Sequence, residues 1–343
     1  MFMMNDHYSK ILSAFSACFG DEPSSVEQVQ AHASQRRIAR LGSGRRETVI
    51  GSFEPNWREA EAFLYLAEHF RCHGLNVPEI LFVDPHRQVI LMTDLGNQTL
   101  LDFLNHERTG ESDVSESVEQ MYQRALVDLI HFQYDAGHLV DFSRCYPTAS
   151  FSGDDMRNDC NLFVRSVIDV LGIPGDQTNL ERELTALVES LSKDSSWNTF
   201  MYRDFQARNI VIKGKSLGYI DFQGGRRGPP AYDVASLVYQ ARAGLSTSVR
   251  RRLLSIYCKA ATDIPGFNEE AFRQQFDEWV LVRLLQAIGR AGELGLQEKK
   301  ELFRSSLPKG LATLLGVLRS GHFSFKPSAL VGFVETLSER VSA

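Results

Sequence analysis

The hydrophobic pattern of this chain changes near residue 94, and this change restricts the folds that the chain can adopt. Before that point, apolar runs are short and bounded by turn residues, as in β-strands, with one helical segment at 57–71 among them. After it, apolar residues recur at helical spacing. Helices are expected at 114–137, 154–172, 178–193, 246–262, 267–292, 297–319 and 326–341.

The first part of the chain is expected to form short strands. A helical stripe of apolar residues precedes them and ends at Gly20. Strand-like runs follow in the segments SVEQVQA, RRIARL, ETVIGSF, EILFVD and QVILMTD. We therefore predict an α+β fold with a small strand-rich N-terminal lobe, residues 1–96, and a larger, mainly helical C-terminal lobe, residues 97–343. The stretch TDLGNQTL joins the two.

One β-like island interrupts the helical part. Its sequence, NIVIKGKSLGYIDF, reads as two strands joined by a turn at 213–215. Asp204 and Asn209 lie in the loop before the first strand, and Asp221 ends the second strand. Because a hairpin returns the end of its second strand to the start of its first, we expect these three side chains to converge.

The three polar side chains on this hairpin suit phosphoryl transfer from a nucleotide. Mg²⁺ takes oxygen ligands, which the amide of Asn209 and the carboxylate of Asp221 can supply. Asp204 can orient an attacking hydroxyl and accept its proton. A single Asp in a loop is usually solvated or caps a turn, but three such residues on one hairpin favour a functional site.

Composition excludes several other classes of protein. The formal net charge is −6, which argues against a general nucleic-acid-binding protein, since that class needs a basic face. The five cysteines are widely spaced and form no CxxC pair, as expected of reduced thiols in the cytoplasm. The first residues lack the basic leader and apolar stretch of a signal peptide, and no apolar run is long enough for a membrane span. We therefore expect a cytoplasmic protein that binds neither nucleic acid nor membrane.

Two motifs carry a resemblance to a known family. YRDFQARN and IDFQGG resemble the catalytic and metal-binding loops of the aminoglycoside phosphotransferase/choline kinase family, a relative of protein kinases. AHASQRRIARL resembles the nucleotide-loop signature of a bacterial subgroup that includes the anomeric kinases for N-acetylmuramate and N-acetylglucosamine. The resemblance covers nearly the whole chain and implies a bilobal protein-kinase-like fold whose small lobe holds an antiparallel sheet and binds the nucleotide.

The resemblance also implies a role for individual residues. Asp204 would be the catalytic base, and Asn209 and Asp221 would hold Mg²⁺. Glu59 or Glu61 would occupy the place of the glutamate on the kinase helix. ATP is the implied phosphoryl donor, held by a phosphate loop and by a hinge whose backbone meets adenine. These nucleotide-binding positions are Ser34, Gln35, Arg36 and Arg37 in the loop and Met92, Thr93, Asp94 and Leu95 in the hinge.

The chain departs from the kinase pattern at its phosphate-binding elements. The strand that normally supplies a lysine reads TVIGSF, without Lys or Arg. The glycine-rich loop is also missing, because LGSGR fits a hairpin turn between the second and third strands. Arg36 and Arg37 are candidates to bind the phosphates instead, since guanidinium groups bind phosphate oxygens in pairs. The alternative is that they form a solvated basic turn.

Further departures lie near the predicted catalytic loop. Arg203 stands where many aminoglycoside kinases have Gly, and Gln206 stands where protein kinases carry Lys. Arg226 and Arg227 follow the metal loop and either contact acidic groups of the substrate or pair with nearby carboxylates. Asp233 is expected to cap a helix or to support the catalytic loop.

These observations predict an ATP-dependent kinase that phosphorylates a small molecule. The resemblance favours an amino sugar of the N-acetylmuramate/N-acetylglucosamine type, phosphorylated at its anomeric hydroxyl. An aminoglycoside or an amino alcohol such as choline is the alternative acceptor, and a cationic acceptor of that kind would need an acidic pocket. Because the strand lysine and the glycine loop are missing, a pseudokinase that binds nucleotide as a scaffold is the alternative of another class.

Overall fold

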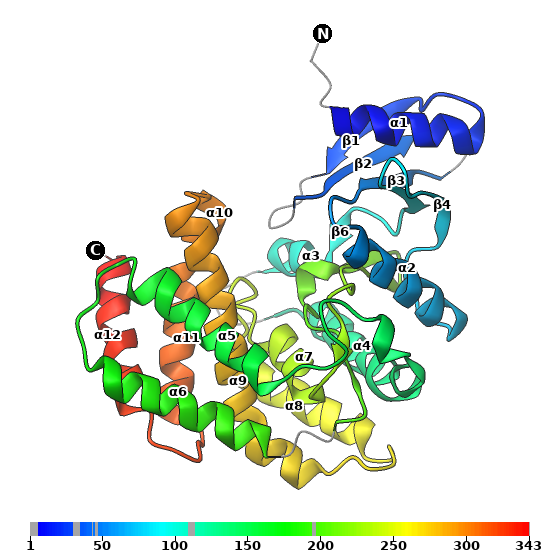
Figure 1. The fold of residues 1–343 in the computed structure, drawn as a ribbon. Coiled ribbons are helices and arrows are strands. Elements are labelled where there is room, and N and C mark those ends of the chain that lie inside the picture. Colours follow the sequence, from blue (N-terminus) through cyan, green and yellow to red (C-terminus); the bar gives the residue numbers. More distant parts are fainter. Residues whose placement is uncertain are drawn as a thin grey trace.

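A computed structural model describes residues 6–29, 35–42, 44, 47–108, 114–193 and 197–342 of the chain. Figure 1 shows a strand-rich N-terminal part above a larger part that consists mainly of helices. The N-terminal part holds five strands in the antiparallel order β1-β2-β3-β5-β4. Their bounds are Ser25–Val29 for β1, Arg37–Gly42 for β2, Val49–Phe53 for β3, Ile80–Asp84 for β4 and Val89–Thr93 for β5. The α+β fold with its small antiparallel sheet is therefore confirmed.

Helix α1, Asp6–Phe19, covers one face of this sheet. Its buried residues, Ile11, Ala14 and Phe15, pack with the apolar side chains of β2, β3 and β5 in a separate small core. A Cβ atom at Gly51 of β3 would lie only 2.4 Å from Cγ2 of Ile11, so the helix can approach the sheet this closely only where β3 has no side chain. The predicted helical stripe before Gly20 thus forms the cover of the sheet.

Helix α2, Trp57–Cys72, connects β3 to β4 and packs on the main core of the protein. Asn56 begins it, because its side chain accepts a hydrogen bond from the backbone N–H of Glu59 at 3.4 Å. The helix ends before Gly74, whose φ of +80° is a conformation that suits glycine. Glu59 therefore lies in the first turn of α2, near the start of β2.

The remaining chain forms helices around α9, a long helix most of whose second half is buried. α9 packs against α5, α7 and α11. The helices of this part are α3 (Leu100–Glu107), α4 (Glu116–Ile130), α5 (Gly153–Phe163), α6 (Gln177–Ser192), α7 (Pro230–Val238), α8 (Thr247–Ala261), α9 (Glu269–Gly292), α10 (Glu301–Arg304), α11 (Leu307–Ser320) and α12 (Ser328–Ser342).

Short strands accompany these helices. β8 (Ile210–Lys213) and β9 (Ser216–Tyr219) form the predicted hairpin, and β6 (Gln98–Thr99) pairs with β8 on its other side. β7 (Phe200–Met201) pairs with β10 (Arg226–Arg227). Both small sheets surround the loops that carry Asp204 and Asp221. The division of the chain at residue 96 stays a prediction.

One predicted helix is wrong in its extent. The segment 297–319 is not continuous: a π-helical turn at Glu293–Gln297 and the short α10 precede α11, which begins at Leu307. Pro308 explains the break, because proline has no N–H group to donate and therefore belongs in the first turn of a helix. The apolar spacing continues across the break, so periodicity alone did not reveal it.

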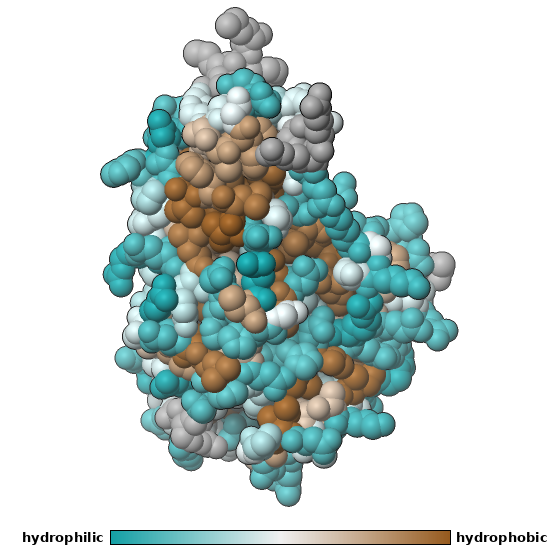
Figure 2. Space-filling model, turned by 90° about the vertical axis from the view of Figure 1, so that its right-hand side faces the viewer, coloured by the Kyte–Doolittle hydropathy of each residue, from teal (hydrophilic) through white to brown (hydrophobic). Residues whose placement is uncertain are grey.

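The surface differs between the two parts of the molecule. Figure 2 shows apolar side chains gathered at the height of the N-terminal sheet, whereas hydrophilic side chains prevail on the rest of this face. Leu81 of the edge strand β4 is a large apolar residue with an exposed fraction of 36%. None of the helices in the described residues combines the length and apolar composition needed to cross a membrane.

Candidate active site

The hairpin brings the three predicted side chains together. Asp204 lies in the loop after β7, Asn209 ends a 3₁₀ turn directly before β8, and Asp221 follows β9. The amide nitrogen of Asn209 donates to the backbone oxygen of Asp204 at 2.9 Å and to Oδ2 of Asp221 at 3.2 Å. The predicted convergence is therefore observed, while the catalytic and metal-binding roles stay predictions.

The backbone at this site departs from ordinary conformations. Arg203 has a φ of +78° and Asp221 a φ of +71°, values that non-glycine residues seldom adopt. Such conformations cost about 1–3 kcal/mol each and persist where the surroundings hold them in place. Hydrogen bonds supply that restraint: the N–H of Ile220 donates to the backbone oxygen of Asn209 at 3.1 Å, directly before Asp221.

The donor atoms around Asp221 suit a hard divalent cation. Asn209 uses its amide nitrogen in both hydrogen bonds, so its oxygen Oδ1 remains available as a ligand. Beside it, the amide nitrogen of Gln223 donates to Oδ1 of Asp221 at 2.8 Å, and the amide oxygen of Gln223 is buried without a hydrogen-bond partner among the described residues. The same residues contain no cluster of three His, Cys, Asp or Glu side chains that could hold a metal ion. This donor set fits Mg²⁺, which usually binds one or two carboxylates and completes its coordination with water and phosphate oxygens.

Asp204 is accessible and ionised at neutral pH. Its side chain is 42% exposed, and its oxygen Oδ1 lies 3.1 Å from the amide nitrogen of Gln206 and 3.5 Å from Nη2 of Arg283. Burial of the carboxyl group alone would raise the pKa of Asp204. The positive charges of Arg283, Arg208 and Arg203 outweigh that effect, so the pKa lies below its ordinary value. A carboxylate in this state can accept a hydrogen bond from a hydroxyl group.

Asp233 supports the loop that carries Asp204. It is fully buried near the start of α7, where it accepts hydrogen bonds from the backbone N–H groups of Tyr202 at 2.7 Å and of Arg203 at 2.9 Å. The amide of Gln133 donates to the same carboxyl group at 3.1 Å. Burial raises the pKa of Asp233 to about 7, although these hydrogen bonds oppose the increase. The predicted support of the catalytic loop is thus observed.

Replacing Asp233 with Ala should destabilise the protein. Two buried N–H groups would lose their acceptor, and each unsatisfied group costs about 1–3 kcal/mol, so we expect a loss of about 2–6 kcal/mol. Urea unfolding measures this change in the free energy of unfolding. Asp169→Ala is the matched control, because Asp169 is exposed, and its effect should stay within about 0.5 kcal/mol. An equal loss in the two variants would contradict this role of Asp233.

Arg36 connects the start of β2 with α2 and the loop that carries Asp221. Its guanidinium group lies 2.9 Å from the carboxylate of Glu54, 2.6 Å from that of Glu59 and 3.8 Å from Oδ1 of Asp221. Burial alone would lower the pKa of Arg36, but these three carboxylates raise it above its ordinary value. Glu59 therefore faces the site, whereas Glu61, the alternative position, is exposed.

The other described positions of the predicted phosphate loop do not share this arrangement. Gln35 is exposed. The guanidinium group of Arg37 donates to the backbone oxygens of Gln35 and Arg36 at 3.3 and 3.1 Å, so it contacts its own loop. Ser34 lies outside the described residues. Arg36 is thus the described residue of this loop that reaches Asp221.

The predicted hinge lies at the end of β5. Met92 is buried and Thr93 bonds to Glu79, its oxygen Oγ1 accepting from the backbone N–H of that residue at 2.9 Å. The carboxylate of Asp94 is occupied by Nε of Arg40 and Oγ1 of Thr48, each at 2.6 Å. The Asp94 side chain thus holds the hinge to β2 and to Thr48, and the contact of this segment with adenine stays a prediction.

Leu95, the last predicted hinge residue, packs against β9. A Cβ atom at Gly218 would lie 2.9 Å from Cδ1 of Leu95. The side chain of Leu95 thus connects the hinge with the hairpin that carries Asn209 and Asp221.

Sequence reasoning missed Arg283 and Glu54. Arg283 lies on α9, is buried, and also donates to Oγ of Ser236. A signal for it was present, because a charged residue inside the apolar stretch WVLVRLL must find a partner when it is buried. Glu54 follows β3 without any comparable pattern. Its contact with Arg36 could not be derived from spacing.

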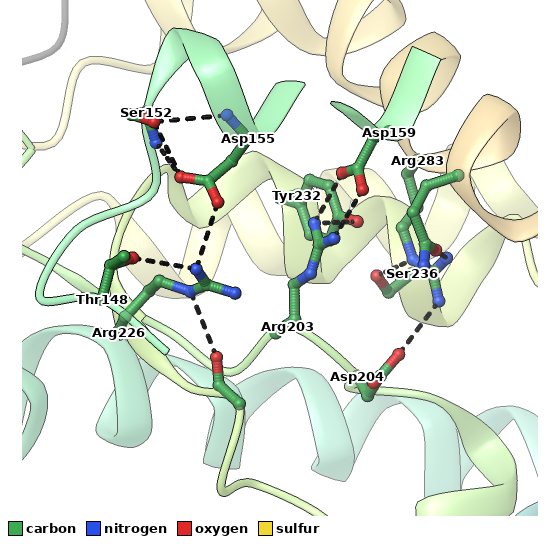
Figure 3. Close-up of polar contacts among 12 residues, drawn as sticks. Thr148, Ser152, Asp155, Asp159, Arg203, Asp204, Arg226, Tyr232, Ser236 and Arg283 are labelled. Atoms are coloured by element: carbon green, nitrogen blue, oxygen red, sulfur yellow. Dashed lines mark hydrogen bonds and ion pairs between the residues drawn. The ribbon is translucent and has the colours of Figure 1, made fainter. Parts of the chain in front are cut away.

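A row of arginines lies beside Asp204, on the side of α5. Figure 3 shows Arg226, Arg203 and Arg283 together with the acidic groups that they contact. Both nitrogens Nη1 and Nη2 of Arg203 lie 2.8 Å from carboxylate oxygens of Asp159 on α5. The carboxylates that face this region are therefore already paired with guanidinium groups.

Comparison with known proteins identifies the family. Residues 25–273 match the model of the phosphotransferase enzyme family, the larger part of the chain. The chain belongs to this phosphotransferase family. The predicted family, the enzymatic class and the ATP-dependent kinase activity are thereby confirmed, without the identity of the acceptor. The family generally uses ATP with a divalent metal ion.

Individual proteins are similar to this chain at low sequence identity. The N-acetylmuramate/N-acetylglucosamine kinase of Pseudomonas aeruginosa is 27% identical over 295 residues, which cover 84% of this chain and 82% of that protein. The protein of the same name from Neisseria meningitidis is 27% identical over 259 residues, 71% of each chain. Among solved structures, a choline/ethanolamine kinase family protein from Mesorhizobium loti matches with a TM-score of 0.63 at 15% identity, covering 98% of this chain and 100% of the other. This last similarity supports the kinase-like fold alone.

Proposed function

We propose that this phosphotransferase uses ATP to phosphorylate the anomeric hydroxyl of an amino sugar of the N-acetylmuramate/N-acetylglucosamine type. The observation that carries the proposal is the name shared by the relatives from Pseudomonas aeruginosa and Neisseria meningitidis, whose similarity extends over most of the chain. The convergence of Asp204, Asn209 and Asp221 supports a phosphoryl-transfer site in the same molecule. The five cysteines form no disulfide, and ATP as donor fits a reaction in the cytoplasm.

The geometry supports separate roles for these residues. Asn209 and Asp221 would hold Mg²⁺, which neutralises phosphate charge when it is bound. Asp204 would accept a hydrogen bond from the sugar hydroxyl, orient it and take its proton as the bond from the sugar oxygen to the γ-phosphorus of ATP forms and the bond from that phosphorus to ADP breaks. No covalent bond to the enzyme is needed, since positioning and charge stabilisation supply most of the catalysis.

Arg36 would take the place of the missing strand lysine. It is a partly buried cation paired with a glutamate of α2 and lies close to Asp221, so it can present N–H groups to phosphate oxygens. Replacing Arg36 with Met should raise the KM for ATP about 10- to 100-fold, the range expected for a hydrogen bond to a charged group. Initial-rate kinetics at saturating sugar measure this change.

Arg37→Met is the matched control for this prediction, because the Arg37 guanidinium contacts only carbonyl groups of its own loop in the described structure. Its effect on the KM for ATP should stay below about threefold. A loss of thermal stability in Arg36→Met without a change in the KM for ATP would assign Arg36 a purely structural role.

The charges near Asp204 favour a neutral or acidic acceptor over a polycation. Asp155 and Asp159, the carboxylates of α5 on this side, are each paired with an arginine. A cationic aminoglycoside or choline would have to compete with these guanidinium groups for the carboxylates. This arrangement supports a sugar without positive charge.

Turnover of ATP with Mg²⁺ against a panel of acceptors tests the proposal. The panel holds N-acetylmuramate, N-acetylglucosamine, choline, ethanolamine and an aminoglycoside, and mass spectrometry detects the phosphorylated product. We expect product from the acetylated sugars. Product from choline or the aminoglycoside alone would overturn the proposed substrate class. Nucleotide binding without any product would favour the scaffold.

A further inference from the structure

Arg226 is a buried cation with one unused group of donors. It lies on β10, and only 5% of its surface is exposed. Nε donates to the backbone oxygen of Gly224 at 3.3 Å, and Nη1 lies 3.0 Å from Oγ1 of Thr148 and 3.4 Å from Oδ1 of Asp155. Nη2 has no hydrogen-bond partner among the described residues and is not one of their fully buried unpaired atoms, so it is open to solvent. The N–H groups of Nη2 are therefore free to donate to a ligand that displaces this solvent.

The positive charge of Arg226 is only weakly balanced. Asp155 is its one ion-pair partner among the described residues, and Oδ2 of that carboxylate already accepts from the N–H and the hydroxyl group of Ser152, each at 2.8 Å. Arg203, by contrast, is bound by both oxygens of Asp159. Burial and the nearby charge of Arg203 lower the pKa of Arg226. This environment favours a further anion.

The unused donors belong to the acceptor side of the site. β10 pairs with β7 so that Arg226 lies opposite Met201, three residues before Asp204 in the chain. The guanidinium carbons of Arg226 and Arg203 lie 5.9 and 5.0 Å from the centre of the same Phe151 ring. In Figure 3 the end of the Arg226 side chain extends toward Arg203, with Asp204 beyond it. Arg203 lies between Arg226 and Asp204 in this view, so an acceptor held at Asp204 would have to extend past Arg203 to place a substituent at Arg226.

We propose that Nη2 of Arg226 binds a carboxylate of the acceptor and so favours the acidic amino sugar over the neutral one. N-acetylmuramate carries a lactyl ether with a carboxylate, where N-acetylglucosamine has a hydroxyl group. Guanidinium groups bind carboxylates through charge-assisted hydrogen bonds, which gives the two sugars different affinities at one site. The inference rests on the proposed function and adds a residue that determines specificity within it.

The ratio of kcat/KM for the two sugars tests this inference. In Arg226→Gln, the ratio of N-acetylmuramate to N-acetylglucosamine should fall about 10- to 100-fold, because a hydrogen bond between charged groups is lost for one sugar alone. Arg227→Gln is the matched control. Successive residues of a strand point to opposite faces, and the guanidinium of Arg227 lies over Phe142, 4.7 Å from the ring centre. The ratio should keep its wild-type value there within about threefold.

A change in the substrate tests the same contact without any substitution in the protein. The methyl ester of N-acetylmuramate has no negative charge, and with the wild-type enzyme its kcat/KM should be about 10- to 100-fold below that of the acid. Equal values for acid and ester, or equal losses for both sugars in Arg226→Gln, would overturn the assignment of Arg226. Failure of the wild-type enzyme to phosphorylate either sugar would instead refute the proposed function, and the inference with it.

Discussion

Replacing Asp204 with Asn should lower kcat about 100- to 10,000-fold, the range that a general base contributes. The amide keeps the size of the side chain but cannot accept the proton of the acceptor hydroxyl. The Asp204 carboxylate is half-exposed and contacts Gln206 and Arg283 rather than Arg36, so the affinity for Mg²⁺–ATP should change little. Steady-state kinetics with the preferred sugar and a binding titration with a non-hydrolysable ATP analogue measure the two effects.

The two measurements also show how the Asp204 prediction can fail. Asp169→Asn, an exposed aspartate on a different part of the surface, should keep the wild-type kcat. If Asp204→Asn weakens the binding of the ATP analogue as strongly as it lowers kcat, Asp204 acts on the nucleotide and its role as base is wrong.

Replacing Asp221 with Asn should abolish turnover at ordinary Mg²⁺ concentrations. The loss should be at least on the order of 1,000-fold, because metal-ion stabilisation of phosphate charge is worth several kcal/mol. The variant loses the carboxylate to which the amides of Asn209 and Gln223 donate, and the remaining amide oxygens are weaker ligands for a hard cation. Activity measured over a wide range of Mg²⁺ concentrations tests the prediction.

Asp221 also lies 3.8 Å from Arg36, so its loss could act through that contact. Metal titration separates the two effects: loss of a ligand raises the Mg²⁺ concentration needed for half-maximal activity, whereas loss of the arginine contact raises the KM for ATP alone. An unchanged Mg²⁺ requirement in Asp221→Asn would refute the assignment of Asp221 as a metal ligand.

The predicted strands and helices agree with the structure wherever local signals are strong. The apolar stripe before Gly20 forms α1, and the segment NIVIKGKSLGYIDF forms the hairpin of β8 and β9. These elements depend on periodicity and turn residues, which act over a few residues. The helix expected at 297–319 was wrong because Pro308 breaks it within a continuous apolar pattern.

The candidate site likewise has one part that the sequence predicted and another that it did not. Asp204, Asn209 and Asp221 lie within one short segment, and the return of a hairpin is a local property of the chain, so the sequence determined their convergence and the class of chemistry that they suit. The surroundings of Asp204 and Asp221 were decided only by the tertiary structure. Arg36 reaches Asp221 across the packing of the N-terminal sheet and α2 on the hairpin, and Arg283 reaches Asp204 from α9. Such ion pairs form where elements distant in the sequence pack together. A buried charge needs a partner of opposite charge nearby in space, and that partner need not be near it in the sequence.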